Sequence, residues 1–275
     1  MTAWAHALVQ WPLGVSVITL VALSAVVSWL AVRLARRTWP HPAFKENHEL
    51  VGFSYSVYGL IYGVFLAFII VVAWQSYAET ERLVMHEATI LSELWRDSLA
   101  FSPAFRDNIH TDLIEYAQSV VDDEWPSMAA SGQAHPLTQA VYERLWTLTY
   151  HIQPETQNQG AYLAEFLARM NELSGARRLR ILHSRQEVHS VLWLVLLVGA
   201  VPTMAYPLLF SNKHAWVQAA IMGSIMLIVM LGLLVTLSLQ HPFSGEAGIA
   251  PEAFRDLLAS FHQRLHAESV SVGGP

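Results

Sequence analysis

Four apolar stretches without Asp, Glu or Lys divide the chain into two pairs. They cover about residues 13–35, 51–77, 188–210 and 215–239, and a polar segment of about 110 residues separates the pairs. A helix that crosses a bilayer needs about 20 mostly apolar residues, and each stretch reaches that length. The pattern therefore predicts a membrane protein with four spanning helices in two hairpins. Since the number of spans is even, both termini and the polar segment are expected on one side of the membrane.

The polar segment, residues 78–187, is predicted to be an extramembrane domain made only of helices. Its apolar residues recur every three or four positions and do not alternate as in a strand. The second spanning helix is expected to run on beyond the membrane to about Phe101. Ser102 and Pro103 are typical of a helix start, and this next helix is expected to end near Trp125. The expected order is a first transmembrane hairpin, the helical domain, a second hairpin and a tail, at residues 1–77, 78–187, 188–240 and 241–275.

The composition agrees with a membrane protein and excludes several other classes. Hydrophobic residues make up 53% of the chain, charged residues 14%, and the mean hydropathy is +0.34. Nucleic-acid binding needs clustered Lys and Arg, whereas the net charge is -6 and lysine occurs only at Lys45 and Lys213. The absence of cysteine excludes disulfides, thiolate catalysis and Cys-ligated metals. The first residues have no positively charged region and no cleavage site, so the first span is expected to be retained.

The distribution of arginine and lysine does not give the orientation in the membrane. The short loops hold Arg33, Arg36, Arg37, Lys45 and Lys213. The other side holds Arg82, Arg177, Arg178, Arg180, Arg185 and Arg255. The positive-inside rule counts such residues near the span ends, and the two sides nearly tie. The three arginines after the first span, taken alone, favour a cytoplasmic first loop and an external helical domain.

The second span has an unusual pattern of small residues. Gly59 and Gly63 form a small-xxx-small pair, which lets helix backbones approach closely. One interpretation is packing within a single subunit. The other is that several copies surround an axis and expose Ser56, Leu60 and Val64, one turn apart, as a hydrophobic constriction that gates by dewetting.

Several segments carry a resemblance to a known family. They are WQSYAETERLVMHEA after the second span, DDEWP at Asp122–Pro126, the run Arg177–Arg180, and HPFSGEAGIAPEAF after the fourth span. In their order and spacing the chain resembles the bacterial bestrophin-like membrane proteins and, more distantly, the bestrophin chloride channels. The resemblance implies a homopentamer in the bacterial inner membrane, with a central anion pore lined by the second helix. It places Ser56, Leu60, Gly63 and Val64 at the neck of that pore, and the helical domain and both termini in the cytoplasm.

The segment after the fourth span departs from the calcium-activated bestrophins. Pro242, Phe243, Gly245 and Glu246 match their Pro-Phe-Gly segment, but the acidic run that follows it in those proteins is missing here. Calcium takes six to eight oxygen ligands, which a single carboxylate does not supply. We therefore expect no calcium clasp and no cofactor. The segment is predicted to be a structural turn that docks the tail.

Acidic and histidine residues beyond the second span suggest an alternative selectivity. Glu79, His86 and Glu93 follow each other at intervals of seven and share a helix face, so in an oligomer they would repeat as rings. Carboxylate rings favour cations. The alternative is a solvated face or ion pairs with Arg82 and Arg96. Two further sets, at His41, His48 and Glu49 and at His183, Glu187 and His189, are explained as well by polar membrane-surface loops as by metal binding, and no metal site is predicted.

No catalytic motif is present, so the protein is not expected to be an enzyme. The acidic run from Asp122 to Glu124 is interpreted as a solvated helix end. The prediction is an oligomeric ion channel in which the preference for anions rests on the resemblance. Its partners are copies of itself, lipid and inorganic ions. A cation channel with carboxylate rings and a non-conducting membrane scaffold or sensor are the alternatives.

Overall fold

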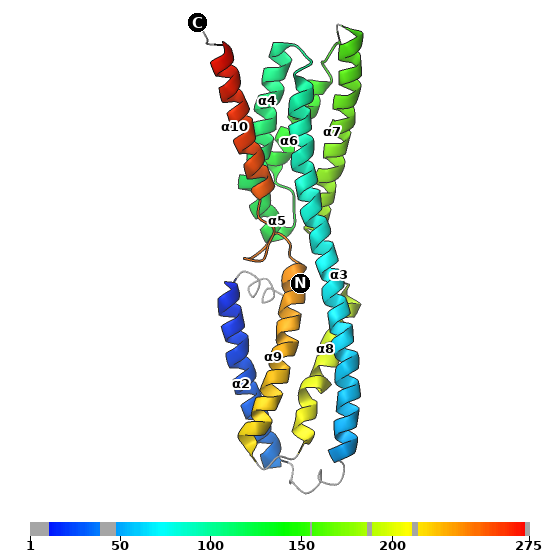
Figure 1. Ribbon diagram of the computed structural model, residues 1–275, viewed down its shortest axis with the longest axis vertical. Coiled ribbons are helices and arrows are strands. Elements are labelled where there is room, and N and C mark those ends of the chain that lie inside the picture. The colour runs from blue at the N-terminus through cyan, green and yellow to red at the C-terminus, as the bar shows by residue number, and fades with distance from the viewer. Residues whose placement is uncertain (1–10, 39–47, 155, 186–188, 211–213, 273–275) are drawn as a thin grey trace. The chain divides into compact units, whose positions relative to one another are not determined.

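A computed structural model describes residues 11–38, 48–154, 156–185, 189–210 and 214–272, and within these ranges it contains helices and no strand (Figure 1). The chain forms two compact units. The first, called the membrane unit below, combines Met1–Tyr77 with Glu187–Gly248. The second, the helical unit, combines Ala78–Gln186 with Ile249–Pro275. The predicted fold class, all-α with four membrane helices, is confirmed.

In the part of the chain that the structure describes, four helices are long and apolar enough to cross a bilayer, and they build the membrane unit. They are α2 (Leu13–Thr38), the first part of α3 (His48–Ser98), α8 (Ser190–Ala205) and α9 (Ala215–Leu239). The chain continues from α8 into a short 3-10 helix, η3 (Tyr206–Leu209), where Pro207 has no N–H to continue an α-helical ladder. The apolar pattern therefore located all four spanning helices.

Two glycines let α3 pack closely against α8 and α9. Tyr62 and Leu66 belong to a buried cluster that includes residues of α8 and α9. A Cβ atom on Gly199 would lie 2.7 Å from the Tyr62 ring, and one on Gly232 would lie 2.7 Å from Leu66 Cδ2. The Tyr62 hydroxyl donates to the Leu196 carbonyl oxygen at 3.3 Å. Close backbone approach and hydroxyl-to-carbonyl contacts are the usual means of helix association in a membrane.

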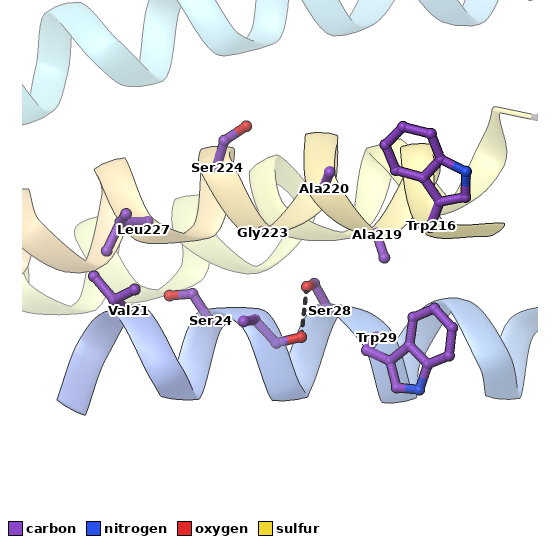
Figure 2. A pocket seen from close by; sticks show the side chains of 11 residues that line it. Val21, Ser24, Ser28, Trp29, Trp216, Ala219, Ala220, Gly223, Ser224 and Leu227 are labelled. Atoms are coloured by element: carbon purple, nitrogen blue, oxygen red, sulfur yellow. Dashed lines mark hydrogen bonds between the residues drawn. The ribbon is translucent and has the colours of Figure 1, made fainter. Parts of the chain in front are cut away.

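Small residues also line the seam between α2 and α9, which Figure 2 shows. Ser24 and Ser28 are buried there, and a Cβ atom on Gly223 would lie 3.0 Å from Ser28 Oγ. Beside them is a mostly apolar hollow of about 280 Å³, with Trp29 of α2 and Trp216 of α9 at the same end of it (Figure 2). The two helices thus pack closely at the small residues and leave an open hollow next to them.

The helical unit is built from the rest of α3 and from the elements on either side of the second hairpin. These are α4 (Pro103–Ser119), the π-helical turn η2 (Val120–Glu124), α5 (Trp125–Ser131), α6 (Pro136–Thr149), α7 (Gln157–His183) and α10 (Glu252–Val272). Helix α4 begins after Ser102 with Pro103 in its first turn, as predicted.

The expected helix end near Trp125 is wrong. The helix passes through η2 into α5 and ends only at Ser131, where Gly132 takes a left-handed conformation with φ 65°. Pro126 lies in the first turn of α5, and the π turn before it shifts the hydrogen-bond ladder, so that Trp125 N–H bonds to the Val120 carbonyl oxygen. A π turn of this kind absorbs an irregularity that would otherwise break the helix.

Candidate pore surface and buried charge network

The membrane part of α3 has one face that none of the described residues of its own unit covers. Leu60 and Val64 are 69% and 63% exposed, and Phe53 and Phe68 are exposed in the same way. The opposite side of the helix, with Tyr62 and Leu66, is buried against α8 and α9. The helix therefore presents a long apolar surface to lipid or to a partner.

Gly63 is exposed on this helix, and Gly59 is half-buried. A Cβ atom built on either glycine meets nothing within 4 Å among the described residues, unlike one on Gly199 or Gly232. Packing within one subunit therefore does not account for this pair. Ser56, one turn before Leu60, is also exposed, and its hydroxyl donates to the Gly52 carbonyl oxygen at 2.9 Å.

Two of the three residues predicted as ion-selecting rings pair with helix α7 of their own unit. Glu93 forms a short ion pair with Arg169, which also holds Asp97 at 3.1 Å. His86 Nε2 lies 3.1 Å from Glu172 Oε1. Glu79 is exposed. The partner of Glu93 is thus an arginine from a distant part of the sequence, and neither Arg82 nor Arg96 takes that place.

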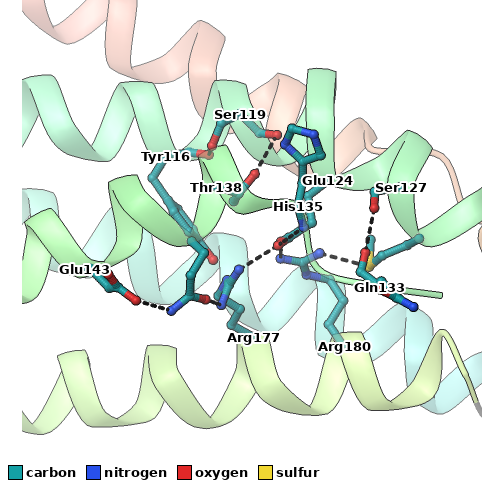
Figure 3. A network of polar contacts seen from close by, with 12 residues as sticks. Tyr116, Ser119, Glu124, Ser127, Gln133, His135, Thr138, Glu143, Arg177 and Arg180 are labelled. Carbon is teal, nitrogen blue, oxygen red and sulfur yellow. Dashed lines mark hydrogen bonds and ion pairs between the residues drawn. The ribbon is translucent and has the colours of Figure 1, made fainter. Parts of the chain in front are cut away.

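A buried charge network links α3, η2 and α7. Figure 3 shows its members Tyr116, Glu124, Arg177 and Arg180. Arg180 is fully buried and binds Glu87 through Nε at 2.6 Å and Glu124 through Nη2 at 2.7 Å. Glu124 also accepts a hydrogen bond from Arg177 Nη2 at 2.6 Å. Tyr116 donates to Glu87 Oε1 at 2.6 Å, which completes the set. Two arginines and two glutamates therefore balance each other away from water.

This network shifts the ionisation of its members. Burial disfavours a charge on Arg180, but Glu87 and Glu124 outweigh this effect and raise its pKa well above the ordinary value. Burial, followed by the negative charge of Glu87, raises the pKa of the Tyr116 hydroxyl well above its usual range. Both residues keep their protonated forms over all physiological pH. The interpretation of Asp122–Glu124 as a solvated helix end is wrong for Glu124, which is completely buried.

The turn after α9 closes the membrane unit. Pro242 and Phe243 are buried, and Gly245 has φ 73°, a conformation that L side chains rarely adopt. Glu246 Oε2 accepts a hydrogen bond from the backbone N–H of Leu13, the first residue of α2, at 2.9 Å. A carboxylate at this place satisfies a free N–H and meets the positive end of the helix dipole.

The chain matches the family model of the Bestrophin-like domain over residues 18–254. It belongs to the bestrophin-like family. Its fold is similar to a bacterial bestrophin homologue from Klebsiella pneumoniae, with a TM-score of 0.64, 12% identity, and coverage of 87% of this chain and 96% of that chain. A structure described as a membrane protein variant is similar with a TM-score of 0.67, 11% identity, and coverage of 87% and 97%. No curated protein matched the chain in sequence.

The structure describes part of the remaining histidine and acidic candidates of this bestrophin-like chain. His183 Nδ1 lies 3.0 Å from Thr80 Oγ1, and His189 precedes the first turn of α8. His41, Glu187 and the side chain of His48 lie outside the described residues. Among the residues that the structure describes, no group of three or more His, Asp or Glu side chains is placed to hold a metal ion.

The charge network is the feature that sequence reasoning missed. Glu87 and Arg180 are 93 positions apart, and an arginine run beside a membrane span reads as a positive-inside signal. The spacing of the arginines along α7 was the one feature of the sequence that could have indicated their burial. Arg177 and Arg180 fall three residues apart, with Leu173 and Met170 on the same apolar stripe of α7, where exposed arginines are not expected.

Proposed function

We propose that the protein is one subunit of a homo-oligomeric ion channel, with a central pore lined by Ser56, Leu60, Gly63 and Val64 of α3. The observation that carries the proposal is the exposed apolar face of α3 with its two unpacked glycines. Copies of α3 around an axis would join these apolar faces into the lining of a central pore.

Leu60 and Val64 are suited to form the narrow part of that pore. They are the most exposed apolar residues of the predicted neck, and a ring of such side chains excludes water until it widens. Gly59 and Gly63, without side chains, allow neighbouring copies to approach at the same level. We take the pentameric state from the resemblance to bestrophins.

Anions are the proposed permeant ions. The membrane part of α3 has no acidic residue beyond its first turn, where Glu49 lies. Of the three residues predicted to form ion-selecting rings, Glu93 is held by Arg169, and His86 is paired with Glu172. These two contacts weaken the case for cation-selecting rings. Glu79, the third predicted ring residue, is exposed and keeps a cation channel as the alternative.

Gating without a calcium clasp is also part of the proposal. Glu246, the single carboxylate of the Pro242–Glu246 turn, is engaged in capping α2. A calcium ion at this turn would compete with that cap and would lack further carboxylates. The turn is therefore proposed to be structural.

Recording from the purified protein in a planar bilayer under a chloride gradient tests this function. We expect unitary currents that reverse near the chloride equilibrium potential, with and without calcium. Reversal near the cation potential would favour the Glu79 alternative. Absence of current over a range of pH and calcium would overturn the channel proposal and favour a scaffold or sensor.

Substitution at the neck tests the lining residues separately. Leu60→Ala is expected to raise the open probability or relax selectivity, because a smaller side chain widens the constriction. Leu194→Ala on α8 is the control, since Leu194 is also exposed and apolar but is not on α3. Equal currents from Leu60→Ala and the unmodified protein would remove Leu60 from the gate.

Assembly and orientation have their own tests. Because the chain contains no cysteine, single cysteines report proximity without background. Leu60→Cys is expected to cross-link between copies, whereas Ile228→Cys on α9 is not.

In sealed right-side-out vesicles, we expect external protease to spare the segment from Leu99 to Gly160, in agreement with a helical unit and termini in the cytoplasm of a bacterium. External cleavage there would reverse the topology.

A further inference from the structure

The hollow between α2 and α9 lies along two spanning helices of the membrane unit. Its volume is about 280 Å³, and Ser28 and Ala219, which form part of its floor, are buried. Ala25 and Ala220 also line the hollow and are exposed, so it is open on one side. A mostly apolar opening along spanning helices faces either lipid or a further copy of the chain.

The length of the hollow matches one leaflet of a bilayer. Its lining extends along α2 from Val21 to Trp29 and along α9 from Trp216 to Leu227. At a rise of 1.5 Å per residue, these two segments are about 12 Å and 16 Å long. The hydrocarbon core of a bilayer is about 30 Å thick, so one leaflet contributes about 15 Å. A single acyl chain of one leaflet therefore fits along the hollow.

Two tryptophans mark the end of the hollow that lies at the membrane surface. Trp29 and Trp216 are at the same end of it (Figure 2), and they are 46% and 66% exposed. Trp216 belongs to the first turn of α9. Tryptophan prefers the interface of a membrane, where its ring contacts acyl chains and its N–H reaches the headgroups. This end of the hollow is therefore at the level of the headgroups.

Beyond Trp29 the same face of α2 carries two arginines. Arg33 and Arg37 follow Trp29 at successive intervals of four residues, so the three side chains share one face of the helix. Both arginines are exposed. Arg36, in contrast, binds Gln218 of α9, with Nε and Nη2 donating to Gln218 Oε1 at 3.3 Å and 3.1 Å. Arg36 thus joins the two helices, whereas Arg33 and Arg37 present their charges to the surroundings.

Neither helix supplies a carboxylate to balance these charges. The sequences of α2 and α9 contain no Asp and no Glu. Arginines at a membrane surface attract anionic lipids, and a guanidinium group binds a phosphate with paired hydrogen bonds. The charges of Arg33 and Arg37, next to the tryptophan end of an apolar hollow, therefore favour an anionic headgroup over an apolar helix of a neighbouring copy.

From these features we propose that the hollow binds one anionic phospholipid per subunit. One acyl chain lies along the floor at Ser28 and Ala219, and the phosphate group accepts hydrogen bonds from Arg33 and Arg37. The site belongs to α2 and α9, whereas the proposed pore is lined by α3. Lipid binding here goes beyond the proposed channel function and does not depend on ion conduction.

Native mass spectrometry of the delipidated, full-length protein tests the site, because it reads both the number of bound lipids and the mass of the oligomer. Dioleoyl phosphatidylglycerol and dioleoyl phosphatidylcholine are the lipid probes, since they have the same chains and differ in net charge. Glycerol phosphate, added in large excess, supplies the phosphate without the chains. We expect one phosphatidylglycerol per subunit, bound about tenfold or more tightly than phosphatidylcholine, and no displacement by glycerol phosphate.

Two variants and two controls locate the binding. Arg33→Gln combined with Arg37→Gln is expected to remove the preference for phosphatidylglycerol, because both charge-assisted contacts are lost. Ala220→Phe is expected to weaken binding about tenfold or more by placing a ring in the hollow. The controls are Arg178→Gln, at an exposed arginine of the helical unit, and Ile228→Phe, at an exposed position of α9 outside the hollow. Both are expected to bind normally, and thermal unfolding checks that each variant is folded.

Three results would overturn the recognition of an anionic lipid. The first is equal binding of phosphatidylglycerol and phosphatidylcholine by the unmodified protein. The second is displacement by glycerol phosphate, which would show a phosphate site that needs no acyl chain. The third is unchanged binding in both variants, which would place the lipid elsewhere on the protein.

The Ala220→Phe variant also tests who occupies the hollow. Normal lipid binding in this variant, with a loss only in the arginine variant, would place the headgroup at Arg33 and Arg37 without a chain in the hollow and would overturn the site. Dissociation of the oligomer with lipid binding intact would show that a second copy covers the hollow, which would also overturn it. A failure of ion conduction alone would leave all of these measurements unaffected.

Discussion

The part of α3 in the membrane unit and the part in the helical unit meet their neighbours through different side chains. Before Tyr77 the helix packs through Tyr62 and Leu66 against glycines of α8 and α9. After Tyr77 it carries Glu87 and Glu93, which bind arginines of α7. Lipid is as apolar as leucine, so helices in a membrane gain from close approach, whereas in the helical unit a buried charge must be paired. One continuous helix thus follows two sets of packing rules.

Breaking the buried charge network of the helical unit is expected to lower the free energy of unfolding more than any other change proposed here. Arg180→Met leaves Glu87 and Glu124 buried without their shared partner, and removal of one member of such a set costs about 3–5 kcal/mol. Thermal unfolding of the detergent-solubilised protein, followed by circular dichroism, measures this loss. Arg178→Met, an exposed position on the same helix, is the control and is expected to change stability by about 0.5 kcal/mol or less. Equal losses in both variants would contradict the pairing of Arg180.

Adding a methyl group to a packed glycine tests the close helix packing of the membrane unit. Gly199→Ala places a carbon atom 2.7 Å from the ring of Tyr62, which is buried and hydrogen-bonded to α8, so it is expected to cost about 1–3 kcal/mol. Gly63→Ala meets no such obstacle in its own subunit and is expected to leave the unfolding of the monomer nearly unchanged. The same unfolding measurement compares the two. A larger loss for Gly63→Ala in monomeric protein would mean that Gly63 does pack within the subunit.

The membrane unit also contains a polar contact, between the Glu246 carboxylate and the backbone N–H of Leu13. Its contribution to stability can be compared with that of the buried ion pairs in the helical unit. Glu246→Gln removes the negative charge at the first turn of α2 but keeps an acceptor, so the expected loss is about 0.3–1 kcal/mol. Raising the salt concentration should shrink the difference, because the interaction is exposed. Glu79→Gln, an exposed carboxylate in the middle of α3, is the matched control and should show no comparable loss. A loss as large as that of Arg180→Met would indicate a further role for Glu246.

The smallest expected effect is a dependence of the protein's stability on pH, which arises from the ionisation of Asp112. Burial raises the pKa of this carboxyl group, although Arg144 partly opposes the shift with a hydrogen bond at 2.8 Å. The folded state therefore takes up a proton at a higher pH than the unfolded state. Stability relative to Asp112→Asn should rise as the pH is lowered from 7 toward the ordinary carboxyl range, and it should fall as the pH rises again. A difference that does not change with pH would contradict the raised pKa.

The sequence was sufficient for those features that depend on local pattern. Apolar stretches of the right length gave all four spanning helices, and Ser102 with Pro103 gave the start of α4. The partners of Glu87 and Glu93 were beyond its reach, because each lies more than 70 positions away on α7 and spacing along one helix carries no information about another. The continuation past Trp125 was missed because a proline usually ends a helix, and only the π turn before it avoids that outcome. For the pore-lining residues, the structure supplies exposure, and their role in conduction is still a prediction.

Helix α10 has a consequence for how the chain is made. Phe261 stacks on the buried Trp95 at 4.3 Å, and the Trp125 indole N–H donates to the Ile249 carbonyl oxygen at 3.0 Å. At about 5–20 residues per second, a ribosome needs roughly ten to thirty seconds to travel from Trp95 to Phe261, and it produces the second hairpin in between. During synthesis, Trp95 therefore lacks its contact with Phe261, and Trp125 lacks its hydrogen bond to Ile249, until these later residues have been made. A nascent chain of this kind would depend on chaperones or on neighbouring copies until its final helix has emerged.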